Sequence, residues 1–517
     1  MEHRTPTDAA ACFRQGLAHA RRHEYDRALV RFTEALDLDP ACAETYHRRG
    51  NALAALGDPA QAIADYTEAI RLDPSCVAAY HDRGTARTAR GEYSQAVADF
   101  TAALLLQPES ADHYNDRGVA FSLQGAFERA IADFTECLRI DPKNAAAYCN
   151  RGNAHASSGN SRQAIADYNE AIRLHPRYAK AYYNRGLALH ATGEYEKAIG
   201  DYTTTLRLDA QTVRAFVNRG RAYASSNDSN HALADFSEAI RREPENADGY
   251  LNRGLIRASQ GAVEQAVADF GAAIARDANC AEAYKNRGSC YAQQGEHAHA
   301  IVDFNEAVRL DPKDAISYYN RGLSRLHRAE VTEAIDDFSE TIRLDPSDAR
   351  AFNNRGNAYQ TRGALAEAIA DFTEAIRLDP RNARLHFNRG LTYQRLGDRS
   401  DALTALREAL ALEPEDPAIL NCVAWILATS PEAELRDGQQ AVEHATRACA
   451  VTEWLVAGFL NTLAAAHAEC GQFDEAIRRL EQALQLPADG HGEEYRTRRA
   501  LYEGGQAFRV EHVSSRV

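Results

Sequence analysis

Small and aromatic residues recur along this chain with a fixed period of 34 residues. An Arg-Gly dipeptide marks this period, and its glycine returns without insertion or deletion from Gly50 to Gly390. One step further back lies Gly16, which gives twelve consecutive units between Ala9 and Asp416. A period of about 20 to 50 residues is typical of solenoids, in which each repeat packs on its neighbours. The pattern therefore predicts one repeat array rather than several separate globular domains.

Within each unit, numbered so that this glycine is position 8, the pattern predicts two helices joined by a tight turn. Position 4 is aromatic in ten units, position 20 is Ala in all twelve and position 24 is aromatic in eleven, as at Tyr46, Ala62 and Tyr66. Positions 20, 24 and 27 share one stripe of a second helix, which we expect to cross the first helix at the small residues. Position 15 is Gly in nine units, as expected for a left-handed helix end, and position 32 is Pro in ten, which stops the second helix.

These residues resemble the tetratricopeptide repeat, whose pattern is an aromatic at position 4, Gly at 8, Ala at 20, an aromatic at 24, Ala at 27 and Pro at 32. The chain is similar to bacterial scaffolds built from many such repeats. The resemblance implies an all-α fold, a right-handed superhelix of paired helices. It also implies that the first helices line a concave groove and the second helices form the convex face.

The register loosens after Asp416, where we expect two diverged hairpins and a cap. The expected helices are Ala418 to Thr429, Gln439 to Ala450, a last hairpin from Phe459 to Leu486, and a capping helix from Glu493 to Gln506. The run AWILATSPEAELRDGQQAV resembles the closing module of many bacterial repeat proteins of this type. The expected division is a lead-in at residues 1–8, the repeats at 9–416, the diverged hairpins at 417–487, and the cap with a loose tail at 488–517.

Both tryptophans, Trp425 and Trp454, fall in this last module. They are candidates for an aromatic binding site, but we expect them to be packed at the cap, because aromatic side chains dominate cores.

Composition narrows the possible functions. A formal charge of -15 argues against a general affinity for nucleic acid or an anionic membrane. The chain contains no apolar run of membrane-spanning length and no signal-peptide core, so we expect a cytoplasmic protein. Its ten cysteines lack the spacings of a zinc site or a disulfide framework, so we expect neither a metal nor a cofactor.

Position 6 of the first helix carries the main candidate for a binding site. After Arg14, Arg48, Asp82 and Asp116, the last eight units carry asparagine there: Asn150, Asn184, Asn218, Asn252, Asn286, Asn320, Asn354 and Asn388. An amide offers a donor and an acceptor, so this ladder is suited to grip the backbone of an extended peptide. It resembles the ladder lining the repeats of the O-linked N-acetylglucosamine transferase, although we expect no catalytic domain here. In the alternative interpretation each Asn bonds the neighbouring helix or is simply solvated.

Side chains around the ladder would set its specificity. Aromatic residues occupy position 5 at Tyr183, Tyr319 and Phe387, and basic residues occupy position 2 at Lys180, Arg214, Arg350 and Arg384. The acidic Asp82 and Asp116 precede them in the early repeats. We therefore expect a ligand of mixed chemistry whose carboxylates are favoured toward the later repeats.

A second pair of columns indicates a structural ion pair. Arg stands at position 7 in eleven units and Asp at position 23 in ten. The sequence leaves open whether they pair within a unit or between neighbours. Being partly exposed, such a pair should contribute about 1 kcal/mol or less.

The resulting prediction is a non-catalytic scaffold that binds a protein or peptide in its groove. No nucleophile, phosphate-binding or metalloprotease motif interrupts the repeats, so we do not expect an enzyme. A carboxylate clamp of the kind some relatives use matches at Lys285, Asn320 and Arg350 but fails at Ser289 and Asn354. The alternatives are a self-assembling structural protein and a regulatory subunit of an enzyme complex; the oligomeric state stays open.

Overall fold

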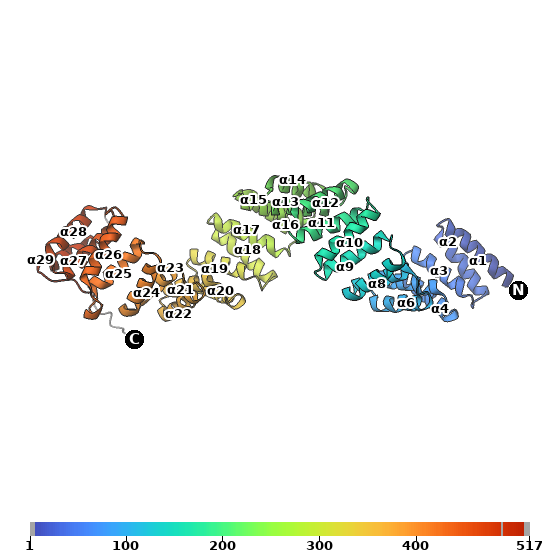
Figure 1. Ribbon diagram of the computed structural model, residues 1–517, viewed down its shortest axis with the longest axis horizontal. Coiled ribbons are helices and arrows are strands. Elements are labelled where there is room, and N and C mark those ends of the chain that lie inside the picture. Colours follow the sequence, from blue (N-terminus) through green and yellow to red (C-terminus); the bar gives the residue numbers. More distant parts are fainter. Residues whose placement is uncertain (1–5, 488–489, 511–517) are drawn as a thin grey trace. The chain divides into compact units, whose positions relative to one another are not determined.

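The computed structural model describes residues 6–487 and 490–510, and within them every regular element is a helix. These residues contain twenty-nine α-helices and one short 3-10 helix. Figure 1 shows how the helices follow one another along the chain. The predicted all-α fold is thereby confirmed. The chain divides into two compact units, Met1–Ile256 and Arg257–Val517, which are described separately.

The first unit consists of paired helices. Their bounds are α1 (Pro6–Arg21), α2 (Tyr25–Leu38), α3 (Ala43–Ala55), α4 (Pro59–Leu72), α5 (Val77–Ala89), α6 (Tyr93–Leu106), α7 (Ala111–Leu123), α8 (Phe127–Ile140), α9 (Ala145–Ser157), α10 (Ser161–Leu174), α11 (Ala179–Ala191), α12 (Tyr195–Leu208), α13 (Val213–Ser225) and α14 (Ser229–Arg242), and α15 (Ala247–Ser259) contains the boundary. From α1 to α14, each odd-numbered helix packs most closely on the helix that follows it, and each even-numbered helix from α2 to α12 then packs on the next hairpin. This is the stacked-hairpin arrangement of a tetratricopeptide solenoid.

The second unit continues the same pairing. Its helices are α16 (Val263–Arg276), α17 (Ala281–Gln293), α18 (His297–Leu310), α19 (Ala315–His327), α20 (Val331–Leu344), α21 (Ala349–Arg362), α22 (Leu365–Leu378), α23 (Ala383–Leu396), α24 (Arg399–Leu412), α25 (Pro417–Thr429), α26 (Gly438–Val451), α27 (Ala457–Glu469), α28 (Phe473–Gln485) and α29 (Gly492–Glu503), with the 3-10 helix η1 at Ala433–Leu435. Local signals fix several helix starts: before α4, the Asp58 carboxylate accepts the Gln61 backbone N–H at 3.0 Å, and Pro59 is the first helical residue.

The two helices of each hairpin cross where the sequence places Gly and an aromatic. A Cβ atom added to Gly50 would lie 2.6 Å from Cε1 of Tyr66, and one added to Gly356 would lie 2.9 Å from Cε1 of Phe372. The aromatic ring therefore occupies the space that any side chain at position 8 would need. The expected close crossing is confirmed.

The turn inside each hairpin uses the left-handed backbone region. Gly57 has φ +83° and Gly363 has φ +85°. Three units place another residue at this position and keep the conformation: His23 (φ 59°), Asn227 (φ 62°) and Ala329 (φ 59°). The tertiary packing of the hairpin thus imposes this backbone conformation even on residues that disfavour it.

Where both residues are present, the Arg and Asp columns pair within single units. Arg355 donates from Nε and Nη2 to the two oxygens of Asp371, at 2.8 Å each, and the same pairing recurs at a separation of 16 residues in other units, for example Arg151 with Asp167. The same guanidinium also bonds position 25 of the preceding unit, as Arg355 does with Ser339 Oγ at 3.0 Å. The arginine therefore joins two neighbouring repeats.

These carboxylates are buried, which corrects the expectation of a partly exposed pair. Asp371 keeps only 6% of its surface exposed and Asp337 only 2%. Removing one partner of a buried pair leaves an uncompensated charge, so a single substitution in the pair should cost more than about 1 kcal/mol.

The C-terminal module closes the array with helices α25 to α29. Buried Tyr495 and Tyr502 of α29 pack in one core cluster with α27 and α28. The helix ends at Glu503 and not at Gln506 as expected, because Gly504 and the left-handed Gly505 (φ 71°) terminate it. Part of the expected lead-in is helical, since α1 begins at Pro6, and the expected loose tail, 511–517, lies outside the described residues.

Candidate functional site

Positions 2, 5, 6 and 9 of a first helix fall within one sector of its surface, which we call the groove face. Most of the ladder asparagines on this face are bonded to the preceding first helix. In four of them the amide nitrogen donates to position 5 of the preceding unit: Asn150 to Asn115, Asn218 to Tyr183, Asn354 to Tyr319 and Asn388 to Asn353, at 2.8 to 3.1 Å. Asn184 donates to Asn153, at position 9 of the preceding unit, at 2.7 Å. These bonds hold successive repeats together.

In the other three rungs the amide nitrogen donates no bond to the preceding first helix within the described residues. Asn252 donates to its own helix at Asp248 O, 2.7 Å away, and accepts from Arg221. Asn286 donates to Glu282 O at 2.8 Å. The amide of Asn320 forms no hydrogen bond within the described part of the chain. In that unit the preceding position 5 is Lys285, which has no acceptor to offer.

The early repeats use the same contact with charged partners. His47 Nε2 lies 2.7 Å from a carboxylate oxygen of Asp82, and His81 Nε2 lies 3.6 Å from one of Asp116. Burial raises the pKa of Asp116, while the neighbouring His81 acts in the opposite direction. Position 5 therefore pairs with position 6 of the next unit as His with Asp early and as Asn or Tyr with Asn later.

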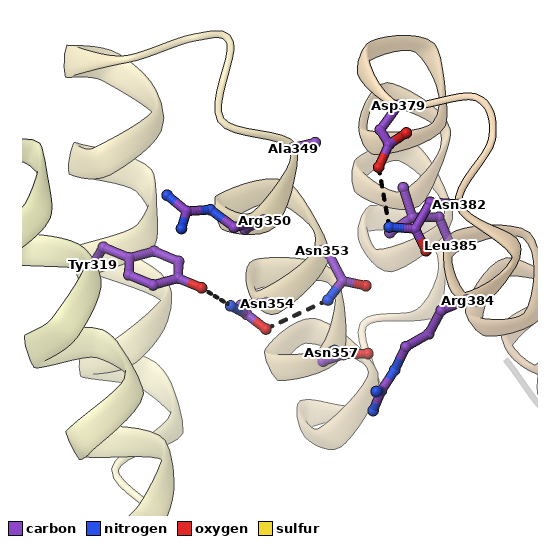
Figure 2. Close-up of a pocket in the computed structure, with 10 residues that line it drawn as sticks. All are labelled: Tyr319, Ala349, Arg350, Asn353, Asn354, Asn357, Asp379, Asn382, Arg384 and Leu385. Atoms are coloured by element: carbon purple, nitrogen blue, oxygen red, sulfur yellow. Dashed lines mark hydrogen bonds between the residues drawn. The ribbon is translucent and has the colours of Figure 1, made fainter. Parts of the chain in front are cut away.

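One pocket gathers several predicted residues of the later repeats (Figure 2). It has a volume of about 330 Å³ and lies among α19, α21 and α23. Tyr319, Arg350, Asn354 and Arg384 line it together with Asn357. The guanidinium of Arg384 has no ion-pair or hydrogen-bond partner in the described residues, whereas that of Arg350 is bound to Asp348 at 2.9 Å. Polar amides and one unpaired cation thus face a common space.

Two further pockets contain ladder residues. A pocket of about 320 Å³ is lined by Asn320, Ser289 and the two stacked imidazoles of His297 and His327, whose ring centroids are 4.3 Å apart. Burial, and secondly the neighbouring His327, lower the pKa of His297. In the first unit, a pocket of about 410 Å³ is lined by Asn184 together with Lys180 and Asn153. No group of three or more metal-binding side chains comes together in the described residues.

Comparisons with known proteins identify the repeat. Family models described as tetratricopeptide repeat or TPR repeat match residues 43–76, 81–145, 149–211, 217–270, 281–314, 361–397, 383–416 and 456–486. Together these matches span more than half of the chain. The chain belongs to the tetratricopeptide repeat family. Proteins of this family are in general protein-interaction scaffolds without catalytic activity.

Solved structures with a similar fold include other tetratricopeptide repeat proteins. The Cut9-Hcn1 tetramer of the APC/C is 16% identical and matches 87% of this chain and 95% of that one, with a TM-score of 0.38. MamA is 27% identical over 33% of this chain and 92% of its own, with a TM-score of 0.31. YrrB, described as having an unusual peptide-binding site, is 22% identical over 38% and 97%, with a TM-score of 0.31. No curated protein matches the sequence.

The remaining predicted residues of this tetratricopeptide array divide into two groups. The aromatic residues at position 5 are half-buried: the Tyr183 ring contacts Tyr202 and the Tyr319 ring contacts Phe338, each on the second helix of the same hairpin, and Phe387 packs against a core cluster. The basic residues at position 2 are exposed: Lys180, Arg214, Arg350 and Arg384. The basic side chains, rather than the aromatic ones, are thus the more accessible part of the predicted site.

Several residues of the pocket among α19, α21 and α23 were not predicted from the sequence, namely Asn353, Asn357 and Asn382. A usable signal was present. When position 5 is compared with position 6 of the next unit, His precedes Asp twice, and Asn or Tyr precedes Asn at the four bonded rungs. This pairing at a separation of 35 residues would have predicted which asparagines are held between repeats.

No described helix combines the length and apolar character that crossing a membrane requires. The expected cytoplasmic location stays a prediction.

Proposed function

We propose that this tetratricopeptide array holds an extended segment of another protein along the groove face of its first helices. The observation that carries the proposal is that three pockets on this face each contain a ladder asparagine, Asn184, Asn320 or Asn354. Pockets of about 320 to 410 Å³ are large enough for single side chains of a bound segment.

The hydrogen bonds between repeats limit how the asparagines of the ladder could bind a peptide backbone. A primary amide carries two N–H donors and a carbonyl oxygen. In Asn354 one N–H donates to Tyr319 and the oxygen accepts from Asn353 at 3.4 Å, whereas the amide of Asn320 bonds to no group among the described residues. We therefore propose that Asn320 makes the strongest backbone contact and that the bonded rungs mainly hold the repeats in register.

The charge of the groove face also indicates which side chains the bound segment carries. Arg384 brings an unpaired guanidinium to the pocket among α19, α21 and α23, and a carboxylate of the bound segment would form a charge-assisted hydrogen bond with it. We propose a ligand whose acidic side chains lie over these later repeats, and no nucleic acid or membrane partner.

The test is affinity capture of proteins from the native cell, followed by measuring the binding of the captured segment to variants. We expect Asn320→Ala and Arg384→Glu each to weaken binding by at least about tenfold, the equivalent of one lost charge-assisted or backbone hydrogen bond. Arg381→Glu is the matched control, because Arg381 is exposed in the turn before α23 but does not line the pocket. Equal binding by wild type and both groove variants, all with unchanged circular dichroism, would remove the groove face as the binding surface.

Self-assembly and a regulatory role in an enzyme complex stay as alternatives. Sedimentation over a range of concentrations distinguishes the first, since a mass that grows with concentration indicates stacking between molecules.

A further inference from the structure

The chain's own residues 506–510 lie without regular secondary structure against helices α25 and α27. Their position follows from the end of α29, where Gly504 and Gly505 reverse the chain. Ala507 to Val510 are half-buried, whereas Glu503 to Gln506 are exposed. An extended segment thus rests on the outside of the last repeats.

The Phe508 ring is the apolar contact of this segment. It lies 6.0 Å from the Trp425 ring, centroid to centroid, and the Arg498 guanidinium stands 4.5 Å from the Phe508 centroid. Arg498 is also 5.1 Å from the Trp425 ring and donates to Asn461 at 2.8 Å. A cation held between two aromatic faces favours an aromatic residue at this place in the segment.

The next residue, Arg509, meets the C-terminal ends of two helices. Its guanidinium donates to the Glu469 carboxylate at the end of α27 and to the Ala428 backbone carbonyl in the last turn of α25. Helix C-termini carry partial negative charge and unpaired carbonyls, so a cation is favoured there. The Glu469 side chain is only 15% exposed, which strengthens the attraction.

A main-chain hydrogen bond fixes the segment's direction. The Val510 N–H donates to the Thr429 carbonyl, the last of α25, at 3.1 Å. This bond involves only the main chain, so any residue except proline could form it at this position.

The core beneath the segment is formed mainly by side chains of α27, α28 and α29. Tyr495 and Tyr502 of α29 are 3% and 1% exposed and already fill the cluster formed with α27 and α28. Residues 506–510 lie over this core and follow α29 through Gly504 and Gly505. Ala507 and Phe508 pack against this core from its surface and stay only half-buried, so the segment covers the core rather than filling it.

We propose that Trp425, Arg498, Glu469 and the last turn of α25 form a docking site for an extended segment in which an aromatic residue is followed directly by arginine. The chain's own Phe508-Arg509 occupies this site and competes with a partner protein that carries the same pair. The site is separate from the asparagine ladder, so it holds whether or not the ladder binds a ligand.

The test compares two truncations of the full chain. One ends after Gly505 and removes the segment; the matched control ends after Val510 and keeps it. A fluorescent peptide with the sequence of residues 505–510 should bind the first and bind the second at least about tenfold more weakly, because a tethered segment has an effective concentration in the millimolar range. Peptides with Phe508→Ala or Arg509→Glu should lose binding, as should Trp425→Ala in the shorter chain.

A full-length variant with two substitutions tests the proposal without any truncation. If the shorter chain does not fold, full-length Phe508→Ala with Arg509→Ala should gain binding of the wild-type peptide. The proposal is overturned if the peptide does not bind to a truncated or doubly substituted chain that keeps the wild-type helical signal. Equal binding of the peptide by the two truncations would also overturn it.

Discussion

At the scale of single residues, the packing of each hairpin depends on a glycine at position 8, where a side chain would not fit. The glycine at position 8 leaves room for the aromatic ring at position 24, and adding even one methyl group there meets the ring. At the turn within the hairpin, by contrast, the chain tolerates other residues in a left-handed conformation that glycine would adopt more easily, as at Ala329 with φ 59°. Steric contact between helices is therefore a stricter constraint here than backbone conformation.

The first prediction compares two glycines on neighbouring helices. Gly186→Ala places Cβ 2.8 Å from Cε1 of the Tyr202 ring and should destabilise the protein by about 1 to 3 kcal/mol. Gly200→Ala has nothing within 4 Å and lies exposed on α12, so it should stabilise by about 0.5 to 1 kcal/mol through helix propensity. Urea denaturation measures both, and shifts of the same sign would contradict the assignment.

At the scale of elements, the unit of construction is a hairpin tied to the one before it. The arginine at position 7 binds the buried Asp of its own hairpin and a Thr, Ser or Asn of the preceding one, for example Arg117 with Asp133 and Thr101. The amide at position 6 adds a second link on the groove face. Polar contacts thus fix the register that apolar packing alone would leave less specific.

The second prediction concerns this arginine link. Asp371→Ala leaves Arg355 partly buried without its carboxylate and should cost about 3 kcal/mol or more. The control is Glu374→Ala, which removes an exposed pair with Arg377 on the same helix. This change should leave the stability of the protein almost unaltered. Thermal unfolding followed by circular dichroism separates the two, and equal melting shifts would show that the buried pair is dispensable.

The third prediction is a dependence on pH at the early hairpins. Burial, and secondly the neighbouring His81, lower the pKa of His113 from its usual 6.5. The unfolded chain therefore binds the proton more readily, so the stability contributed by neutral His113 is complete above pH 6.5 and is lost as the pH falls toward its folded pKa. His113→Gln should make unfolding less sensitive to pH between 6.5 and 5, and an unchanged pH profile would exclude this role.

At the scale of the molecule, the described helices make their extensive contacts only with helices one or two places away in the chain. Each of the two units, Met1–Ile256 and Arg257–Val517, therefore resembles a row of coupled hairpins rather than a single core. In such a row, stability spreads through nearest neighbours and fades with distance.

The fourth prediction follows from this locality. Gly186→Ala should increase hydrogen exchange in α11 and α12 and in the adjoining α10 and α13, while α1 to α4 keep their protection. Hydrogen exchange with mass spectrometry resolves these segments. Uniform loss of protection across α1 to α14 would instead indicate that the first unit unfolds as a single cooperative body.

The sequence by itself determined the period, the helix pairs and the crossing point, because small and aromatic residues at fixed positions admit one way of packing. It also determined that Arg and Asp pair, and the structure decided that they do so within one unit and that the carboxylate is buried. The asparagine column was visible in the sequence, but its bonds were not, since each depends on the residue that the stack places beside it.

Only the tertiary structure decided that Asn354 bonds to Tyr319 while the amide of Asn320 has no partner in the part of the chain that the structure describes. It also decided that residues 506–510 return to Trp425 and the end of α25, a contact spanning more than 80 positions. Periodicity predicts what repeats from unit to unit. Contacts made once, between side chains that no period relates, depend on where the folded chain brings them together.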